Sequence, residues 1–159
     1  MRIYRITSEK PLESYNGLGA SDLDGARWNN KGYPVMYFAM SASVAMLEMA
    51  NYYPLPKFIP KNFMLGIYEI PDQLLAQFDL SLLPDDWNVY PYPSSTRKLG
   101  SEWLDLNSNA GLIVPSAATP DGLESIIVVN ARHPGAGQIK LIDKKLKLFN
   151  ERAFVGRKD

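Results

Sequence analysis

The pattern of apolar and polar positions is densest between residues 35 and 53. Val35 to Met40 carries apolar side chains at both odd and even positions, which is typical of a strand buried on both faces. Ser41 and Ser43 then offer N-cap hydroxyls, and Ala42 to Tyr53 contains helix-forming residues without an internal Gly or Pro. The pattern therefore predicts a central strand that is followed directly by a helix.

One carboxylate interrupts the apolar pattern of this helix. At helical spacing Met46, Met49 and Ala50 surround Glu48. Burying an ionised carboxylate is costly unless a cation or hydrogen-bond donors meet it, so the fold should supply partners. Arg27, in the preceding Gly/Asn-rich loop, is the nearest candidate in the sequence.

The first half of the chain also contains weaker patterns. Met1 to Thr7 predicts a short strand, expected at a sheet edge, and Pro11 to Asn30 predicts a long loop with a turn or two of helix. Three prolines exclude regular helix from Tyr53 to Asn62. Phe63 to Ile70 alternates as a second strand.

The second half predicts further short elements within the same domain. They are a short helix at Gln73 to Leu75, a surface loop at Pro84 to Pro93, a helix at Ser95 to Asn107 with a stop at Asn109 to Gly111, a strand at Leu112 to Val114, a turn at Pro115 to Pro120, a strand at Ser125 to Val129, and a loop at Asn130 to Gly137 leading to Ile139 to Ile142. No linker or repeat divides the chain. We therefore expect one α+β domain over residues 1–159, with a central mixed sheet flanked by helices.

Composition excludes several classes of protein. Hydrophobic residues make up 46% of the chain and charged residues 21%, as in soluble globular proteins. The 17 basic and 17 acidic residues cancel, and no long basic run precedes the short tail with Arg152, Arg157 and Lys158. An electrostatic footprint for nucleic acid is therefore missing, which disfavours direct DNA binding and a ribonuclease.

The expected setting is a reducing cytoplasm. The chain has no cysteine, and the start MRIYRITSEK lacks the apolar core of a signal peptide. The longest apolar region, Val35 to Ala50, is interrupted by polar residues and is shorter than the ~20 residues of a membrane span. The single histidine, His133, cannot build a His-based metal site alone, and we expect it to be structural.

Four blocks occur in order along the chain: GARWNNKG, YPVMYFAMSASVAMLEM, WLDLNSNAGLIVPSA and IIVVNARHP. Together they resemble the RES domain, which is named for its arginine, glutamate and serine, and the resemblance extends from Ile3 to about Phe154. It implies a fold like that of ADP-ribosyltransferase toxins. It also implies the toxin of a toxin–antitoxin pair, whose partner is an Xre-type helix-turn-helix antitoxin. Activity in the family centres on NAD, most often its degradation with release of nicotinamide.

The resemblance implies specific site residues. Arg27 is the arginine of the RWN block, Tyr37 the tyrosine of the following strand, Glu48 the glutamate of the helix and Ser116 the serine of VPSA. We expect the loop around Arg27 and the turn around Ser116 to converge on one cleft lined by all four. Three further residues are expected to help bind substrate, namely Asn29, Lys31 and Asn130.

The chemistry of NAD cleavage suits these residue types. Nicotinamide is a pyridinium cation in NAD and departs as an uncharged pyridine, so the leaving group needs no acid. Positive charge develops instead on the ribose, as an oxocarbenium-like ribosyl cation. Glu48 would stabilise that cation, while Arg27 would bind the diphosphate or a ribose oxygen. The Tyr37 ring would stack on nicotinamide, and Ser116 would hydrogen-bond ribose or the carboxamide. NAD is the substrate in this scheme, and no step requires a metal.

Each assignment has a structural alternative. Arg27 and Glu48 could form a buried ion pair, Tyr37 could be a core aromatic, and Ser116 could be a turn residue. Trp28 is expected to pack rather than to act on substrate. The alternative functions are an ADP-ribosyltransferase that modifies a protein, and a non-catalytic interaction module.

The expected partners follow from the same reasoning. A chain that destroys NAD must be held inactive in its own cytoplasm, and no segment resembles an autoinhibitor. We expect an antitoxin protein to cover the site. The apolar loop from Tyr52 to Pro60 is expected to support self-association, giving a homodimer within the complex.

Overall fold

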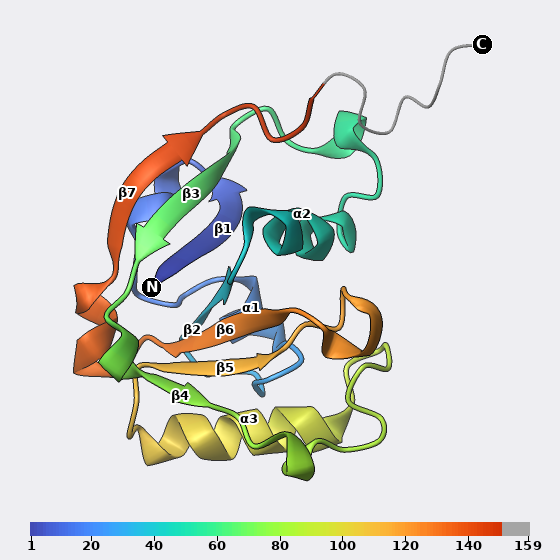
Figure 1. The fold of residues 1–159 in the computed structure, drawn as a ribbon, viewed down its shortest axis with the longest axis vertical. Helices are drawn as coiled ribbons and strands as arrows, with labels where there is room; N and C mark the ends of the chain where they lie inside the picture. The colour runs from blue at the N-terminus through green and yellow to red at the C-terminus, as the bar shows by residue number, and fades with distance from the viewer. Residues whose placement is uncertain (151–159) are drawn as a thin grey trace.

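A seven-stranded mixed sheet organises the protein, with β2 (Val35–Ala39) at its middle. The computed structural model describes residues 1–150, and its strand order is β4-β5-β6-β2-β1-β3-β7 (Figure 1). Only β4 and β5 pair in parallel, and every other neighbouring pair is antiparallel. The expected α+β class with a mixed sheet is confirmed. The basic tail with Arg152, Arg157 and Lys158 lies outside the described residues.

The remaining elements follow in chain order. They are β1 (Arg2–Ser8), α1 (Ala20–Asp24), α2 (Ala42–Ala50), β3 (Phe63–Glu69), β4 (Leu75–Gln77), α3 (Ser94–Leu106), β5 (Gly111–Pro115), β6 (Ser125–Asn130) and β7 (Lys140–Lys145), with short 3-10 turns between several of them. Within residues 1–150, no helix is long and apolar enough to cross a membrane.

β2 is buried on both faces, as its sequence predicts. Val35 and Ala39 belong to one apolar cluster, whereas Met36 and Phe38 belong to a second one. The first cluster also contains residues of α2 and α3, so both helices pack on the same face of the sheet. The face that carries Val35 therefore lies beneath the helices, where the candidate site is built.

The helix after β2 begins as expected and ends early. The Ser41 hydroxyl caps it by accepting a hydrogen bond from the backbone N–H of Val44 at 3.2 Å. The regular helix ends at Ala50, and the backbone N–H groups of Tyr52 and Tyr53 both bond the carbonyl of Met49. Glu48 consequently stands in the last turn of α2, close to the segment that leaves the helix.

Two expected elements differ from the structure. β1 is an interior strand rather than an edge, because it pairs with β3 along its whole length and meets β2 at Tyr4↔Ala39. The Arg5 side chain of β1 lies over the Phe38 ring, with its guanidinium carbon 5.8 Å from the ring centroid. The helix expected at Gln73 to Leu75 is a 3-10 turn at Asp72–Leu74, and β4 follows because the backbone of Leu75 to Gln77 finds distant partners on β5.

Candidate active site

The Glu48 carboxylate is held by the serine of the VPSA block. Ser116 follows β5 directly, is fully buried, and donates its hydroxyl to Glu48 Oε1 at 2.6 Å. The same hydroxyl accepts a hydrogen bond from the backbone N–H of Ala118 at 3.2 Å. The turn after β5 therefore orients the hydroxyl that binds the carboxylate. Within residues 1–150, the second oxygen, Oε2, receives one long hydrogen bond, from Asn51 Nδ2 at 3.5 Å. One oxygen of Glu48 is thus oriented, while the other is weakly engaged.

Arg27 is anchored by backbone carbonyls and an aromatic ring. Its Nη1 donates to the carbonyl oxygen of Trp87 and to that of Val89, the latter at 3.0 Å. Its guanidinium carbon lies 5.1 Å from the centre of the Tyr92 ring. Burial lowers the pKa of Arg27, while the negative potentials of Tyr92 and Glu48 oppose that shift. An arginine remains charged under such conditions, so its positive charge is held in place by neutral groups.

The buried ion pair between Arg27 and Glu48, which the sequence left open as a structural alternative, is not formed among residues 1–150. No ion pair in the described part of the chain includes either residue. The reason is that neutral partners satisfy both groups: Ser116 meets the carboxylate, and two carbonyls meet the guanidinium. Arg27 and Glu48 nevertheless lie close enough for the carboxylate to influence the pKa of the guanidinium.

Tyr37 uses its hydroxyl to shape the loop that carries Arg27. It donates to Asn29 Oδ1 at 2.7 Å and accepts from the backbone N–H of Trp28 at 3.2 Å. Asn29 is fully buried and donates in turn to the carbonyls of Ser21 and Asn30. Removal from water raises the pKa of Tyr37 above its ordinary range, so the hydroxyl stays protonated. Tyr37 and Asn29 therefore act on the conformation of the loop.

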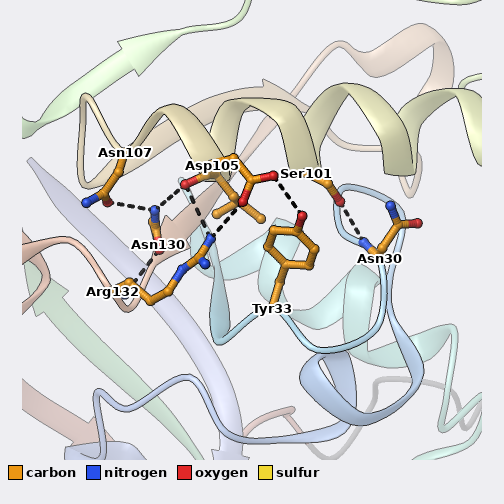
Figure 2. A network of polar contacts seen from close by, with 8 residues as sticks. Asn30, Tyr33, Ser101, Asp105, Asn107, Asn130 and Arg132 are labelled. Carbon is orange, nitrogen blue, oxygen red and sulfur yellow. Dashed lines mark hydrogen bonds and ion pairs between the residues drawn. The ribbon is translucent and has the colours of Figure 1, made fainter.

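The same loop is fastened to α3 on its other side. The Ser101 hydroxyl accepts from the backbone N–H of Asn30 at 2.9 Å, and the Tyr33 hydroxyl donates to Asp105 Oδ2 at 2.9 Å (Figure 2). One residue before Ser101, α3 approaches the backbone of the loop at Gly100. A Cβ added there would lie 2.6 Å from the Trp28 carbonyl carbon and closer still to its oxygen. A glycine is required by this approach.

Two expected binding residues are not brought to this cluster. Asn130 is fully buried beside the C-terminal end of α3, where Nδ2 donates to the Leu104 carbonyl and to Asn107 Oδ1, each at 2.9 Å (Figure 2). Its Oδ1 accepts from the backbone N–H of Arg132, so its side chain is fully used in the fold. Asn107 itself has a left-handed φ of 51° and caps α3, which ends within one residue of the helix expected at Ser95 to Asn107. Lys31 is exposed, with no polar contact to residues 1–150.

Two tyrosines belong to the cluster without having been expected there. The hydroxyls of Tyr52 and Tyr92 are 2.9 Å apart and form a hydrogen bond between the segment after α2 and the passage before α3. Tyr92 also carries Arg27 over its ring. The sequence signal was the motif YPYP within an otherwise polar stretch, which reads equally well as a surface loop. In Figure 1 this passage, α2 and the turn after β5 lie on the same side of the molecule.

The other residues singled out from the sequence have structural surroundings. Trp28 is fully buried and packs edge-on against Phe78, with ring centres 5.2 Å apart. His133 accepts from the backbone N–H of Gly135 at 2.9 Å. Residues 1–150 contain no group of three or more His, Cys, Asp or Glu side chains that could hold a metal ion.

Known proteins resemble this chain in sequence and in fold. A protein named Toxin Res, from Photorhabdus laumondii, is 39% identical over 132 residues, which cover 82% of this chain and 81% of that protein. The Prs ADP-ribosylating toxin of a Sphingobium species is 31% identical over 143 residues, covering 88% and 86% of the two chains. The crystal structure of the M. tuberculosis MbcT–MbcA toxin–antitoxin complex contains a chain with a TM-score of 0.71 and 22% identity, over 91% of this chain and 82% of that one. This last likeness concerns the fold alone.

A family model for the RES domain matches residues 2–149, which is nearly the whole chain. The match covers all four blocks in which the resemblance was seen, and the toxins just named align over most of the same length. The chain therefore belongs to the RES domain family.

Proposed function

We propose that this chain is the toxin of a toxin–antitoxin pair and that it consumes NAD by cleaving the bond between nicotinamide and ribose. The observation that carries the proposal is the pair formed by an oriented carboxylate and an uncompensated guanidinium. Ser116 holds Glu48 Oε1 at 2.6 Å, while Arg27, whose pKa the Glu48 charge influences, has no carboxylate partner among residues 1–150. A structural ion pair would have neutralised both charges.

Glu48 is the group that stabilises the transition state in this proposal. When the C1′–N bond breaks, its electron pair leaves with the neutral nicotinamide, and positive charge develops on the ribosyl ring. A carboxylate fixed in advance stabilises that charge as it forms, without reorganising during the reaction. The hydrogen bond from Ser116 fixes Oε1 and leaves Oε2 as the oxygen more available to the sugar. Water or phosphate then captures the cation.

Arg27 binds the diphosphate of the substrate. Its Nη1 is occupied by two carbonyls, and Nε and Nη2 have no hydrogen-bond acceptor among residues 1–150. Two unused donors on a planar guanidinium match two oxygens of a phosphate group. Tyr37 and Asn29 support this role by holding the loop from which Arg27 projects. Stacking of the Tyr37 ring on nicotinamide remains a prediction.

The direct test is NAD consumption by the purified chain without any antitoxin. We expect loss of NAD and release of one nicotinamide for each NAD consumed, measured by chromatography. If NAD stays intact after long incubation, the chain is a non-catalytic interaction module.

A second function is supported by the name of one relative, the ADP-ribosylating toxin from Sphingobium. The same site would pass the ribosyl group to a protein side chain in place of water or phosphate. Incubating the chain with adenine-labelled NAD and cell lysate distinguishes the two reactions. Free labelled product indicates hydrolysis or phosphorolysis, whereas labelled protein indicates transfer.

The partner in this proposal is an antitoxin of the Xre helix-turn-helix type. Support comes from the fold likeness to a chain in a toxin–antitoxin complex and from the family itself. A homodimer within that complex is proposed on the exposed apolar residues that follow α2, which include Tyr52, Leu55 and Phe58 at 67%, 41% and 57% exposure.

A further inference from the structure

Tyr92 has two contacts that together connect opposite sides of the site. Its ring lies beneath the Arg27 guanidinium at 5.1 Å, and its hydroxyl is 2.9 Å from that of Tyr52. Tyr52 follows α2, the helix that carries Glu48, whereas Tyr92 precedes α3. A single hydrogen bond thus joins the segment next to the carboxylate to the ring next to the guanidinium.

The surroundings of the bond indicate that it serves the site more than the core. Tyr52 is 67% exposed, so its ring contributes little buried area to the fold. Tyr90, two residues before Tyr92 and 78% exposed, packs edge-on against the Tyr92 ring with centres 5.5 Å apart. Arg97 approaches the same ring at 5.9 Å. Tyr92 is therefore fixed from several directions while facing a region that solvent reaches.

We infer that Tyr92, held by the hydroxyl of Tyr52, is a positioning residue that sets the guanidinium of Arg27 for the diphosphate of the substrate. The two carbonyls that hold Arg27, those of Trp87 and Val89, belong to the same passage as Tyr92. Tying that passage to the end of α2 therefore fixes the spacing between Arg27 and Glu48. This inference rests on the proposed NAD-cleaving function and names residues that the family resemblance did not assign.

The hydrogen bond between the two tyrosine hydroxyls can be removed at either residue while both aromatic rings are kept. Tyr52→Phe and Tyr92→Phe each delete one hydroxyl and keep both rings, so Arg27 retains its aromatic neighbour. Each variant should raise the KM for NAD about 3- to 10-fold, as expected for one lost hydrogen bond. The kcat should stay close to that of the wild type, because Ser116 still holds Glu48. The double variant should match either single variant, because all three lack the same bond.

Two further variants separate the ring from the hydroxyl. Tyr92→Leu removes the ring beneath Arg27 and should raise the KM about tenfold more than Tyr92→Phe does. Tyr90→Phe is the matched control, because the Tyr90 hydroxyl has no hydrogen-bond partner among residues 1–150. Its KM and kcat should equal those of the wild type.

The experiment measures KM, kcat and melting temperature for all these variants, starting with the wild type. The Kd of NAD, measured by calorimetry in the Glu48→Gln background, should rise with Tyr92→Phe by the same factor as the KM. A wild type that leaves NAD intact would remove the proposed function and this inference together. With an active wild type, the inference alone is overturned if the two Phe variants keep the wild-type KM, if their effects add in the double variant, or if only their melting temperatures fall.

Discussion

At the scale of single residues, the site depends on how Glu48 is satisfied. A buried carboxylate predicted from helical spacing needed a partner, and the nearest cation in the sequence was the natural choice. The structure supplies Ser116, which lies 68 residues further along the chain. The helical periodicity could identify Glu48 as an unusual carboxylate. It could not identify the donor, because the turn that carries Ser116 is placed by the pairing of β5 with β6.

Replacing Glu48 by Gln tests whether its charge acts in catalysis. The amide keeps nearly the same volume and still accepts the hydrogen bond of Ser116, and no ion pair with Arg27 is lost. We expect NAD cleavage to fall by about 10²-fold or more, as for other single electrostatic groups in active sites. The melting temperature should be unchanged, as checked by calorimetry.

The companion variant is Ser116→Ala, which leaves the charge of Glu48 and removes its orienting donor. Its loss of kcat should be smaller than that of Glu48→Gln. A Glu48→Gln protein that melts early, yet turns over NAD normally for each folded molecule, would contradict the catalytic role and favour a structural one.

Tyr37 gives a prediction about stability and pH. Its pKa is raised above the ordinary value of 10.0 in the folded protein, so above about pH 10 the unfolded chain releases the phenolic proton first. The folded state then binds more protons than the unfolded state, and the free energy of unfolding must fall as pH rises. Urea unfolding between pH 8 and pH 11 should show this fall, to which the raised pKa values of Tyr52 and Tyr68 also contribute.

The variant Tyr37→Phe isolates the contribution of Tyr37 to the pH dependence of the free energy of unfolding. At pH 8 the variant should be less stable than the wild type, because the bonds to Asn29 and Trp28 are lost. Above pH 10 the difference should narrow, since only the wild type has this proton to lose. A constant difference across the range would show that Tyr37 ionises equally in both states.

At the scale of elements, the central strand and its helix could be predicted, while strand β4 and the order of the strands in the sheet could not. β2 and α2 have local patterns strong enough to fix their type, with errors only at the ends. β4 and the interior place of β1 depend on partners far along the chain, on β5 and on β3 respectively. No local pattern carries that information.

The contact between α3 and the loop that carries Arg27 can be tested with the variant Gly100→Ala. Helix propensity alone says that Gly100→Ala should stabilise the protein by up to about 1 kcal/mol. The approach of the Trp28 carbonyl to Gly100 predicts the opposite sign, because the new methyl group must push the loop off the helix. We expect a loss of about 1–3 kcal/mol in the free energy of unfolding and a raised KM for NAD.

Gly137→Ala is the matched control, because a Cβ at Gly137 would meet nothing within 4 Å. Chemical denaturation of both variants measures the difference. If Gly100→Ala were as stable as the wild type or more so, the close approach of helix and loop would be wrong, and with it the idea that α3 positions Arg27.

At the scale of the whole molecule, the sequence could identify the four residues of the family motif but not their supporting groups. The motif residues gather around one site because β2, α2 and the turn after β5 meet on one side of the sheet. Asn130 stands apart from them, buried and bonded to the end of α3, and the local sequence of an asparagine that caps a helix does not differ from that of one that binds substrate. Tyr52 and Tyr92 were missed because they are 40 residues apart in the sequence, and only the fold brings their hydroxyls into hydrogen-bonding contact.

The last prediction concerns the antitoxin. Within residues 1–150 the guanidinium of Arg27 has no carboxylate partner, and exposed aromatic residues such as Tyr52 and Tyr90 border the site. A second protein chain that covers the site would therefore gain both charge and apolar contacts. We expect expression of this chain alone to stop growth, and co-expression with the neighbouring reading frame to restore growth and yield a complex that copurifies. The Glu48→Gln chain should be harmless alone and still copurify, because covering the site does not require turnover. Toxicity that the neighbouring frame leaves unchanged would argue against a proteinaceous antitoxin encoded there. Copurification lost together with turnover would mean that the partner recognises a reaction product and not the site itself.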